Sequence, residues 1–412
     1  MNYLRRLSFE RKTVALFVLL VAVTAAFFPG ERRNVYHVYD VGTRSVIIGM
    51  NPYPSPGGQG SSPLPIARFD CSPTFAYFFA PFSTHHGLGP EAGGYAWVML
   101  NLLTFMAGVW ALFSLVDGEK KLLRKRWFLL SLLLLAGEMP GSIMNGYSNA
   151  LITGMMMAGA GLYMRGYKGW AALVLAAGTN FKLFPLMMAL FLGLDFGIGF
   201  ISGFAVIAGL FFLLPVPIMG SASYGTMLAS WYDIVVNEPL NTSYLGLEPT
   251  LLHYGFHITS AEFAFFMLAN ATALALASFH LLRKDRGELI RLIMPALLGF
   301  VVLFDRWAES QSFITITPVF IFILHAALRA REEGDDAGFR ANILFIVAGW
   351  VLIWWGYSPF SSRIFNVTAA MLHFKTLGAV LMYLWAWARI VIHFADKMQA
   401  EGTVIPVTGA AQ

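Results

Sequence analysis

The stretch from 170 to 194, WAALVLAAGTNFKLFPLMMALFLGL, carries a single charged residue, Lys182, within an apolar run. A charge at membrane depth costs about 2.5–3.5 kcal/mol on insertion scales, so an intramembrane lysine predicts a functional site. Pro185 follows three residues later and cannot continue a preceding helix, because it lacks a backbone N–H and its ring clashes. The stretch therefore predicts two short helical segments, 168–181 and 183–195, with Lys182 at the break between them.

The composition of the whole chain predicts a polytopic membrane protein. Of 412 residues, 57% are hydrophobic and 12% are charged, with a mean hydropathy of +0.64. Soluble domains have about 25% charged residues. The net charge of +5 comes from basic residues scattered in short loops, so no nucleic-acid partner is expected. The single cysteine, Cys71, excludes a disulfide framework and a cysteine metal site.

The predicted fold is an all-α polytopic bundle with about twelve transmembrane helices, since each span needs about 20 apolar residues. The first apolar stretch follows basic residues and would also fit a cleaved signal peptide, but it is long enough to span. We expect a single transmembrane domain over 1–397 and a disordered cytoplasmic tail over 398–412. The predicted spans are 12–29, 95–116, 127–145, 147–164, 168–181, 183–195, 197–215, 259–282, 289–304, 311–328, 341–357 and 374–395.

Short loops rich in Lys and Arg define the orientation. They comprise the N-terminus and 117–126, 165–168, 283–291 and 329–340, and their placement on one side predicts that both termini are cytoplasmic. The other side carries two long segments rich in Pro, Gly, Asn and aromatic residues, which predict ordered extracytoplasmic loops with short surface helices. These loops cover 30–94, where 35–48 is expected to be helical, and 216–258.

Four motifs occur in order along the chain: VYDVGTRSVIIGMNPY (38–53), FDCSPTFAYFFAPF (69–82), the block from 146 to 185, and NTS (241–243). Together they resemble the signatures of glycosyltransferase family 87, the bacterial polyprenyl-phosphate-dependent mannosyltransferases. The block from 146 to 185 is the most specific, because its spacing also matches. Gly146, Asn149, Lys182 and Pro185 match the family's motif, and Tyr147 stands where the family has glutamine.

The resemblance implies a GT-C-type membrane hexosyltransferase whose active site faces the extracytoplasmic side of the bacterial inner (cell) membrane. Its partners would be a polyprenyl-phosphate sugar donor (mannose favoured), a lipid-linked or envelope glycan acceptor, and membrane lipids. The sequence departs from the family in two places. Asn34 or Val35 stands where the family has an acidic residue before the first-loop tyrosine. The stretch DRWAESQSFITITP (305–318) lacks the family's late histidine and has Glu309, Gln311 or Ser312 in its place.

A sugar on a lipid phosphate already has a good leaving group, so the site needs a carboxylate base for the acceptor hydroxyl and cations for the phosphate. One base and direct displacement imply inversion. Asp40 is the first candidate for the base, and Asp70 is the second. The structural alternatives are an ion pair of Asp40 with Arg44 one helical turn away and a helix N-cap at Asp70.

Lys182 is predicted to clamp the donor phosphate, and its structural alternative is a lysine that snorkels to the interface. Arg306, Arg363 and Lys375 are further candidates for the phosphate, with membrane anchoring as their alternative. Candidate substrate-binding residues are Tyr39, Tyr53, Asn149, Asn180, Asn241, Ser243, Trp307, Glu309 and Gln311. No metal or cofactor is expected, since the adjacent His85 and His86 cannot readily share one ion.

Two other classes of protein remain open at this point. A transporter or lipid flippase would use Lys182 as a midplane substrate site, although paired halves with broken helices at corresponding positions are not evident. A non-catalytic component of envelope assembly would tolerate the loss of both Lys182 and Asp40.

Overall fold

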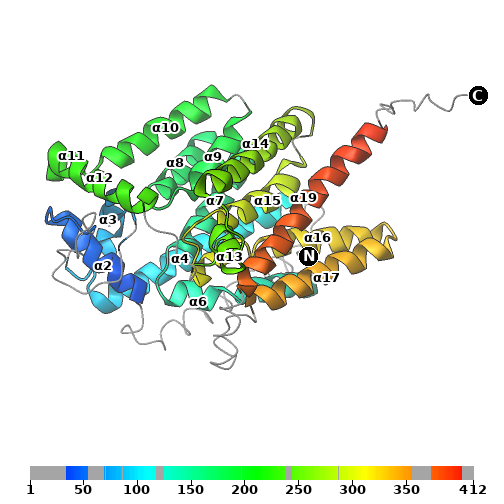
Figure 1. The fold of residues 1–412 in the computed structure, drawn as a ribbon, viewed down its shortest axis with the longest axis horizontal. Helices are drawn as coiled ribbons and strands as arrows, with labels where there is room; N and C mark the ends of the chain where they lie inside the picture. Colours follow the sequence, from blue (N-terminus) through cyan, green and yellow to red (C-terminus); the bar gives the residue numbers. More distant parts are fainter. Residues whose placement is uncertain are drawn as a thin grey trace, which may run out of the picture.

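A computed structural model describes residues 34–53, 69, 71–85, 87–116, 125–195, 197–237, 244–285, 287–354 and 373–400. Every regular element in these ranges is a helix, which confirms the all-α prediction (Figure 1). The predicted span 12–29 and most of the predicted tail lie outside the described residues, and the last helix continues to Ala400.

The helices are α2 (Asn34–Ile47), α3 (Pro73–Phe79), η2 (Ala80–Phe82), α4 (Pro90–Val116), α5 (Lys125–Ala136), α6 (Met139–Met144), α7 (Asn149–Met164), α8 (Lys168–Thr179), α9 (Phe184–Gly193), α10 (Ile198–Leu213), α11 (Val216–Met219), α12 (Ser221–Asn237), α13 (Leu247–His253), α14 (Ser260–Lys284), α15 (Leu289–Leu303), η3 (Ser310–Thr315), α16 (Val319–Glu332), α17 (Asp336–Trp354) and α19 (Phe374–Ala400).

The stretch around Lys182 folds as a helical hairpin of α8 and α9. At its closed end, a Cβ on Gly178 would lie 2.9 Å from Pro185 Cγ, so the two helices meet there. At its open end, Lys168 forms an ion pair with Asp195 at 3.7 Å. The predicted break is confirmed, and Lys182 lies in the turn between the helices.

In the described residues, fewer helices are long and apolar enough to cross a membrane than the twelve predicted for the whole chain. Six helical segments in the described residues are long and apolar enough: 91–116, 198–219, 260–284, 310–332, 336–354 and 374–399. The predicted span 127–145 divides into α5 and α6, because a proline occupies the first turn of α6. The predicted span 311–328 begins as the 3₁₀-helix η3, and the α-helical part starts only after Pro318.

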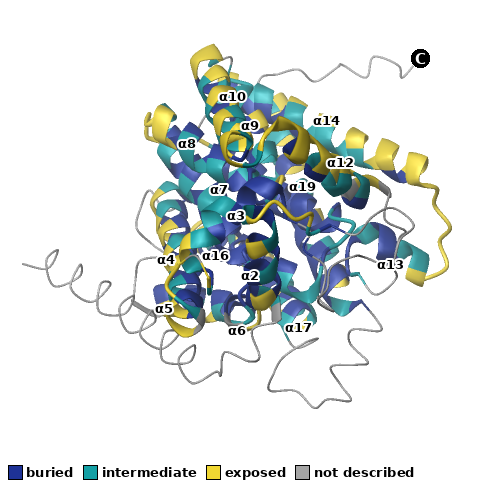
Figure 2. Ribbon diagram, turned by 90° about the vertical axis from the view of Figure 1, so that its left-hand side faces the viewer, coloured by how far each residue is buried: buried dark blue, intermediate teal, exposed yellow. Residues whose placement is uncertain are grey.

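The bundle is held together by close helix contacts, one of which joins the backbones of α4 and α7. A Cβ on Gly154 would lie 2.3 Å from the carbonyl oxygen of Thr104, and a Cβ on Gly108 would lie 2.5 Å from that of Gly154. Small residues let helix backbones approach in this way. Figure 2 shows the burial pattern, with α10 largely exposed and α7 in the interior.

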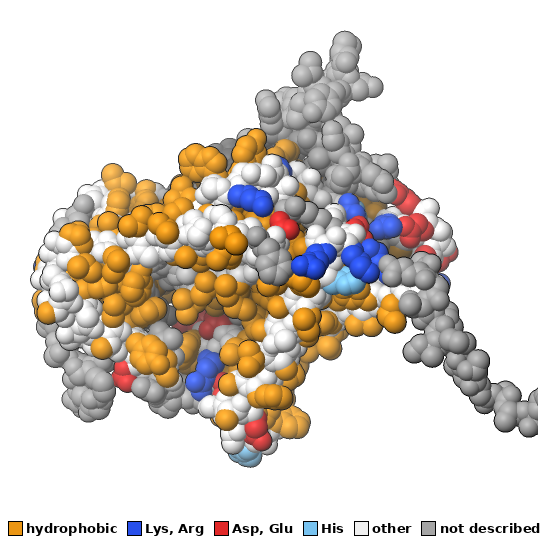
Figure 3. Space-filling view, turned by 90° about the horizontal axis from the view of Figure 1, so that it is seen from above, with side chains coloured by type: hydrophobic (Ala, Val, Ile, Leu, Met, Phe, Trp, Pro, Cys, Tyr) orange, Lys and Arg blue, Asp and Glu red, His pale blue; other side chains and the backbone are white. Residues whose placement is uncertain are grey.

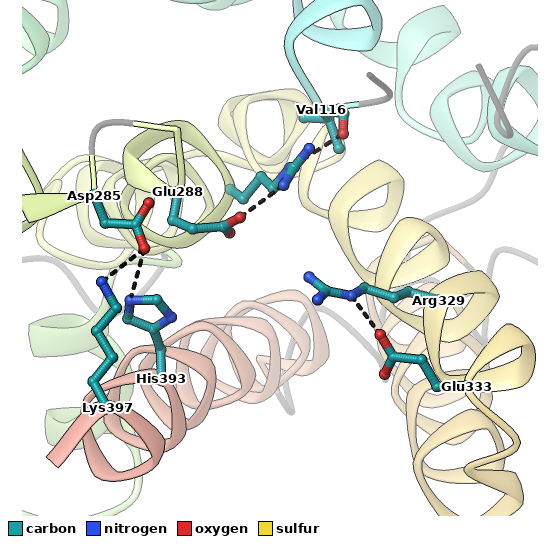
Figure 4. A network of polar contacts seen from close by, with 8 residues as sticks. Val116, Asp285, Glu288, Arg329, Glu333, His393 and Lys397 are labelled. Carbon is teal, nitrogen blue, oxygen red and sulfur yellow. Dashed lines mark hydrogen bonds and ion pairs between the residues drawn. The ribbon is translucent and has the colours of Figure 1, made fainter. Parts of the chain in front are cut away.

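The described parts of the predicted basic loops lie at one end of the bundle, whereas the N-terminus and most of the loop 117–126 lie outside the described residues. Arg291 donates to the Val116 carbonyl at 3.3 Å, Asp285 pairs with Lys397 at 2.9 Å, and Arg329 pairs with Glu333 at 2.8 Å (Figure 4). Contacts described below join the first loop, the hairpin turn and the segment 305–312 at the opposite end. This partition agrees with the predicted separation of basic loops from long loops.

Replacing Gly154 with alanine should destabilise the fold. The new Cβ would collide with backbone on α4, and overpacking of this kind costs about 1–3 kcal/mol. We expect a lower Tm for the Gly154→Ala variant in detergent. Gly203→Ala on α10 is the matched control, because no atom lies within 4 Å of its new Cβ. Equal Tm values for the two variants would contradict the proposed tight contact.

Candidate functional site

Helix α2 forms hydrogen bonds both within the first long loop and to the segment before α7. The Tyr36 hydroxyl donates to the Phe82 carbonyl at 2.6 Å, and the Tyr39 hydroxyl lies 3.2 Å from Ser148 Oγ. Gly146 has a φ of 79°, and a Cβ there would lie 2.9 Å from Tyr36 Cβ. Glycine at 146 therefore permits both the turn before α7 and the close approach of α2.

Asp40 lies on α2, which confirms the helix predicted over 35–48. Its two carboxylate oxygens accept hydrogen bonds from the backbone N–H and the hydroxyl of Thr84, each at 2.7 Å. Asp40 is 5% exposed. Arg44 contacts His85 Nε2 at 3.1 Å, and no ion pair joins it to Asp40 among the described residues. The alternative of an Asp40–Arg44 pair is therefore wrong.

The turn that holds Lys182 touches the first loop directly. Ser72 is the N-cap of α3, accepting from the Phe75 N–H at 3.3 Å, and its hydroxyl donates to the Asn180 carbonyl at 2.5 Å. The ring of Phe181 lies 5.5 Å from that of Phe75. Lys182 is half-buried, with Nζ 5.7 Å from the centre of the Phe184 ring.

The α3 helix also packs on α12 of the second long loop. The hydroxyl of Thr74 donates to the Phe212 carbonyl at 3.4 Å, and that of Tyr224 donates to the same carbonyl. Burial raises the pKa of Tyr77 and of Tyr224 above the usual phenol value, so both hydroxyls stay protonated at neutral pH. Helices α3 and α12 therefore meet at the Phe212 carbonyl of α10 through polar, uncharged groups.

The segment 305–312 connects α15 to η3 and carries several half-buried polar side chains. Glu309 accepts a hydrogen bond from the Tyr147 hydroxyl, and its own N–H donates to Ser312 Oγ at 3.2 Å. The N–H of Trp307 donates to Asp305 Oδ1 at 3.1 Å. Tyr147, from the block 146–185, thus contacts the segment 305–312 through Glu309.

Two candidate phosphate-binding cations already have carboxylate partners. Arg306 Nε lies 2.7 Å from Glu248 Oε2, at an angle that makes the contact an ion pair rather than a directed hydrogen bond. Lys375 Nζ lies 2.7 Å from Glu138 Oε2, and both of these side chains are 5% exposed. A phosphate at Lys375 would have to displace Glu138, whereas Arg306 keeps more exposed surface.

Glu138 is the residue of this region that sequence reasoning missed. It was expected inside the span 127–145, where it received no role. The sequence did contain a signal for Glu138. A carboxylate within an apolar run, next to a Pro-containing turn, has a free-energy cost of membrane insertion like that of Lys182.

Asn149 lies at the start of α7 and is almost fully buried. Neither its side-chain nitrogen nor its oxygen has a hydrogen-bond partner within the described part of the chain. Its carbonyl accepts from Thr153, which also bonds Thr315 of η3 at 2.9 Å. Because buried amides are nearly always satisfied, an open carboxamide here is suited to a ligand or water.

The remaining candidate residues are placed as follows. Tyr53 is buried, and its hydroxyl donates to the Cys71 carbonyl at 2.6 Å. The side chain of Asn180 donates to the Ala176 carbonyl at 2.9 Å, so it caps its own helix. Gln311 is half-buried beside Ser312. Asp70, Asn241, Ser243 and Arg363 lie outside the described residues, and Ser72 rather than Asp70 caps α3.

These contacts bring together two groups of side chains: Asp40 and Lys182 around α2 and α3, and the polar segment 305–312 with Tyr147 and Asn149. The face in Figure 3 is mostly apolar and has a hollow with acidic and basic side chains inside it. Among the described residues, no group of three His, Cys, Asp or Glu side chains is arranged to hold a metal ion. The arrangement offers carboxylates, amides and cations to a polar ligand.

The family model of Glycosyltransferase family 87 matches residues 72–305. The match begins at the N-cap of α3, includes the whole α8–α9 hairpin and ends at the start of the segment 305–312. No curated protein matches the chain in sequence.

Replacing Ser72 with alanine should loosen the contact between the first loop and the hairpin turn. The variant loses an N-cap and a buried hydrogen bond to Asn180, together worth about 1–3 kcal/mol. We expect a lower Tm in detergent and faster proteolysis of the first loop. Ser202→Ala is the control, because that exposed hydroxyl bonds only within α10. A Ser72→Ala variant as stable as this control would argue against the contact.

Proposed function

Because the chain belongs to glycosyltransferase family 87 and is therefore a membrane glycosyltransferase, we propose that it moves a hexose, with mannose as the first candidate, from a polyprenyl phosphate to a lipid-linked or envelope glycan acceptor. Direct displacement at the anomeric carbon would invert its configuration. The site would face the extracytoplasmic side of the bacterial cell membrane, with both termini cytoplasmic.

The observation that carries this proposal is the contact between the hairpin turn and the first loop. The hydrogen bond from Ser72 to the Asn180 carbonyl holds the turn of Lys182 against α3. In turn, Phe75 of α3 packs on Tyr39, with ring centres 4.8 Å apart, and Tyr39 precedes Asp40 in α2. An ammonium and a carboxylate thus belong to one packed unit.

In this proposal Lys182 binds the phosphate of the donor. The ammonium is a compact point charge on a flexible stem, which suits a lipid phosphate whose negative charge grows as the sugar leaves. The half-buried Arg306 is the second cation, if a phosphate shares it with Glu248. Lys375 is enclosed with Glu138, so we give it a smaller part in phosphate binding.

Asp40 is proposed as the base that takes the proton of the acceptor hydroxyl. The two bonds from Thr84 fix the orientation of the carboxylate, and each carboxylate oxygen keeps a second lone pair for the acceptor. Proton transfer to a positioned side chain contributes about 10²–10⁴-fold to a rate. Tyr39, Asn149, Trp307, Glu309 and Gln311 would bind sugar hydroxyls, as would Tyr53, Asn180, Asn241 and Ser243 in the wider cleft.

The Asp40→Asn variant should retain its fold and lose at least about 100-fold in transfer rate, because an amide keeps the contact with Thr84 but cannot act as the base. The measurement is sugar transfer in proteoliposomes supplied with radiolabelled polyprenyl-phosphate mannose, glucose or galactose. Asp285→Asn is the control, because it neutralises a carboxylate at the opposite end of the bundle and should keep the wild-type transfer rate. Full activity of Asp40→Asn would remove Asp40 from the mechanism.

The Lys182→Met variant should bind the donor at least about 10-fold more weakly, since a buried charge-assisted contact with phosphate is worth about 1.5–3 kcal/mol. The KM for the donor in the same assay measures this. Lys168→Met, at the open end of the hairpin, is the control. Movement of the lipid across the bilayer without loss of its sugar would instead identify a flippase, and an unchanged KM would exclude the phosphate clamp.

A further inference from the structure

A buried ion pair joins two distant parts of the chain beneath the segment 305–312. The ammonium of Lys375, in the first turn of α19, lies 2.7 Å from Glu138, the N-cap residue of α6. Glu138 makes no capping hydrogen bond with its side chain. Buried ion pairs add little net stability, because the cost of desolvation offsets the attraction. The pair therefore calls for a role other than stability.

The ammonium of Lys375 also donates to the Ser310 carbonyl at 3.1 Å. The neighbouring Thr376 donates to the Leu245 carbonyl at 2.5 Å, and the Leu245 N–H donates to the Ala308 carbonyl at 2.7 Å. The first turn of α19 thus holds the segment 305–312 at Ser310 directly and at Ala308 through Leu245.

Ser310 lies between Glu309 and Gln311, two side chains proposed above to bind sugar. Glu309 also accepts a hydrogen bond from Tyr147. Since the backbone at Ser310 is attached to the Lys375 ammonium, a displacement of that ammonium would shift both neighbours. The position of the ammonium in turn depends on the carboxylate of Glu138.

We propose that Glu138, acting through Lys375, is a positioning residue for the sugar-binding segment 305–312. Its carboxylate keeps the ammonium on the Ser310 carbonyl and neutralises it. Without that charge, the buried ammonium loses its carboxylate partner, a strongly unfavourable state that displaces it from the Ser310 carbonyl. The consequence for catalysis rests on the proposed function, whereas the position of the segment can be measured independently of any activity.

The single native cysteine makes that measurement direct. Cys71 is 2% exposed, so a Gln311→Cys variant of the full chain places one reactive thiol on the segment. Its reaction rate with fluorescein maleimide in detergent should rise at least about fivefold when Glu138→Gln is added. Asp285→Asn is the matched control: it removes the partner of Lys397 at the opposite end of the bundle and should leave the rate unchanged.

A second variant tests the same role independently, in case Glu138→Gln misfolds. The double change Glu138→Leu and Lys375→Met replaces the ion pair with apolar side chains of similar size, an exchange that is often neutral or stabilising. It also removes the donor to the Ser310 carbonyl, so the same rise in labelling is expected at an unchanged Tm.

Transfer kinetics complete the test. Without the reporter cysteine, Glu138→Gln should lower kcat/KM at least about tenfold. The double variant should do the same at an unchanged Tm, and Asp285→Asn should not lower kcat/KM. Wild-type labelling rates in both the Glu138→Gln and the double variant would overturn the positioning role. If labelling rises but the native chain transfers sugar from none of the polyprenyl-phosphate probes, the positioning role stands and the proposed function fails.

Discussion

A polar connection between two membrane helices must satisfy its backbone groups within the protein, because lipid offers no hydrogen-bond partners. In the segment 305–312, the backbone carbonyls of Ala308 and Ser310 accept from Leu245 before α13 and from Lys375 at the start of α19. The side chain of Glu309 accepts from Tyr147 before α7. The conformation of the segment is thus set by residues that are far from it in sequence. A site built on such a segment is ordered before any ligand arrives.

The polar contacts at the two ends of the bundle differ in their exposure to water. At one end, ion pairs such as Asp285–Lys397 join the connections between helices, and these groups keep access to water. At the other end, the polar contacts are more enclosed, as at Asp40 and at Glu138 with Lys375. Enclosed polar groups are costly unless every partner is in place, which makes the second end the more sensitive to substitution.

Local features were predictable from the sequence, and contacts between distant segments were not. The break at Lys182 follows from a lysine and a proline within one short stretch, and the structure confirms it as the turn between α8 and α9. The helix α2 was also predictable from its own residues. In contrast, the partner of Asp40 is Thr84 rather than Arg44 one turn away, since packing of the loop overrides the helical neighbour. The carboxylate of Glu138 is visible locally as a charge within an apolar run, but its partner Lys375, 237 residues away, is not.

The shortness of the α8–α9 hairpin has a consequence for depth. Twelve residues of α8 measure about 18 Å along the helix axis, whereas the hydrocarbon core of a bilayer is about 30 Å thick. If the open end lies at the inner surface, the turn with Lys182 ends well below the outer surface, and α3, bonded to it through Ser72, reaches down with it. The helical segment 198–219, which packs beside α8, is long enough to cross the core by itself. The bundle therefore keeps its full thickness, while the turn with Lys182 lies recessed within it.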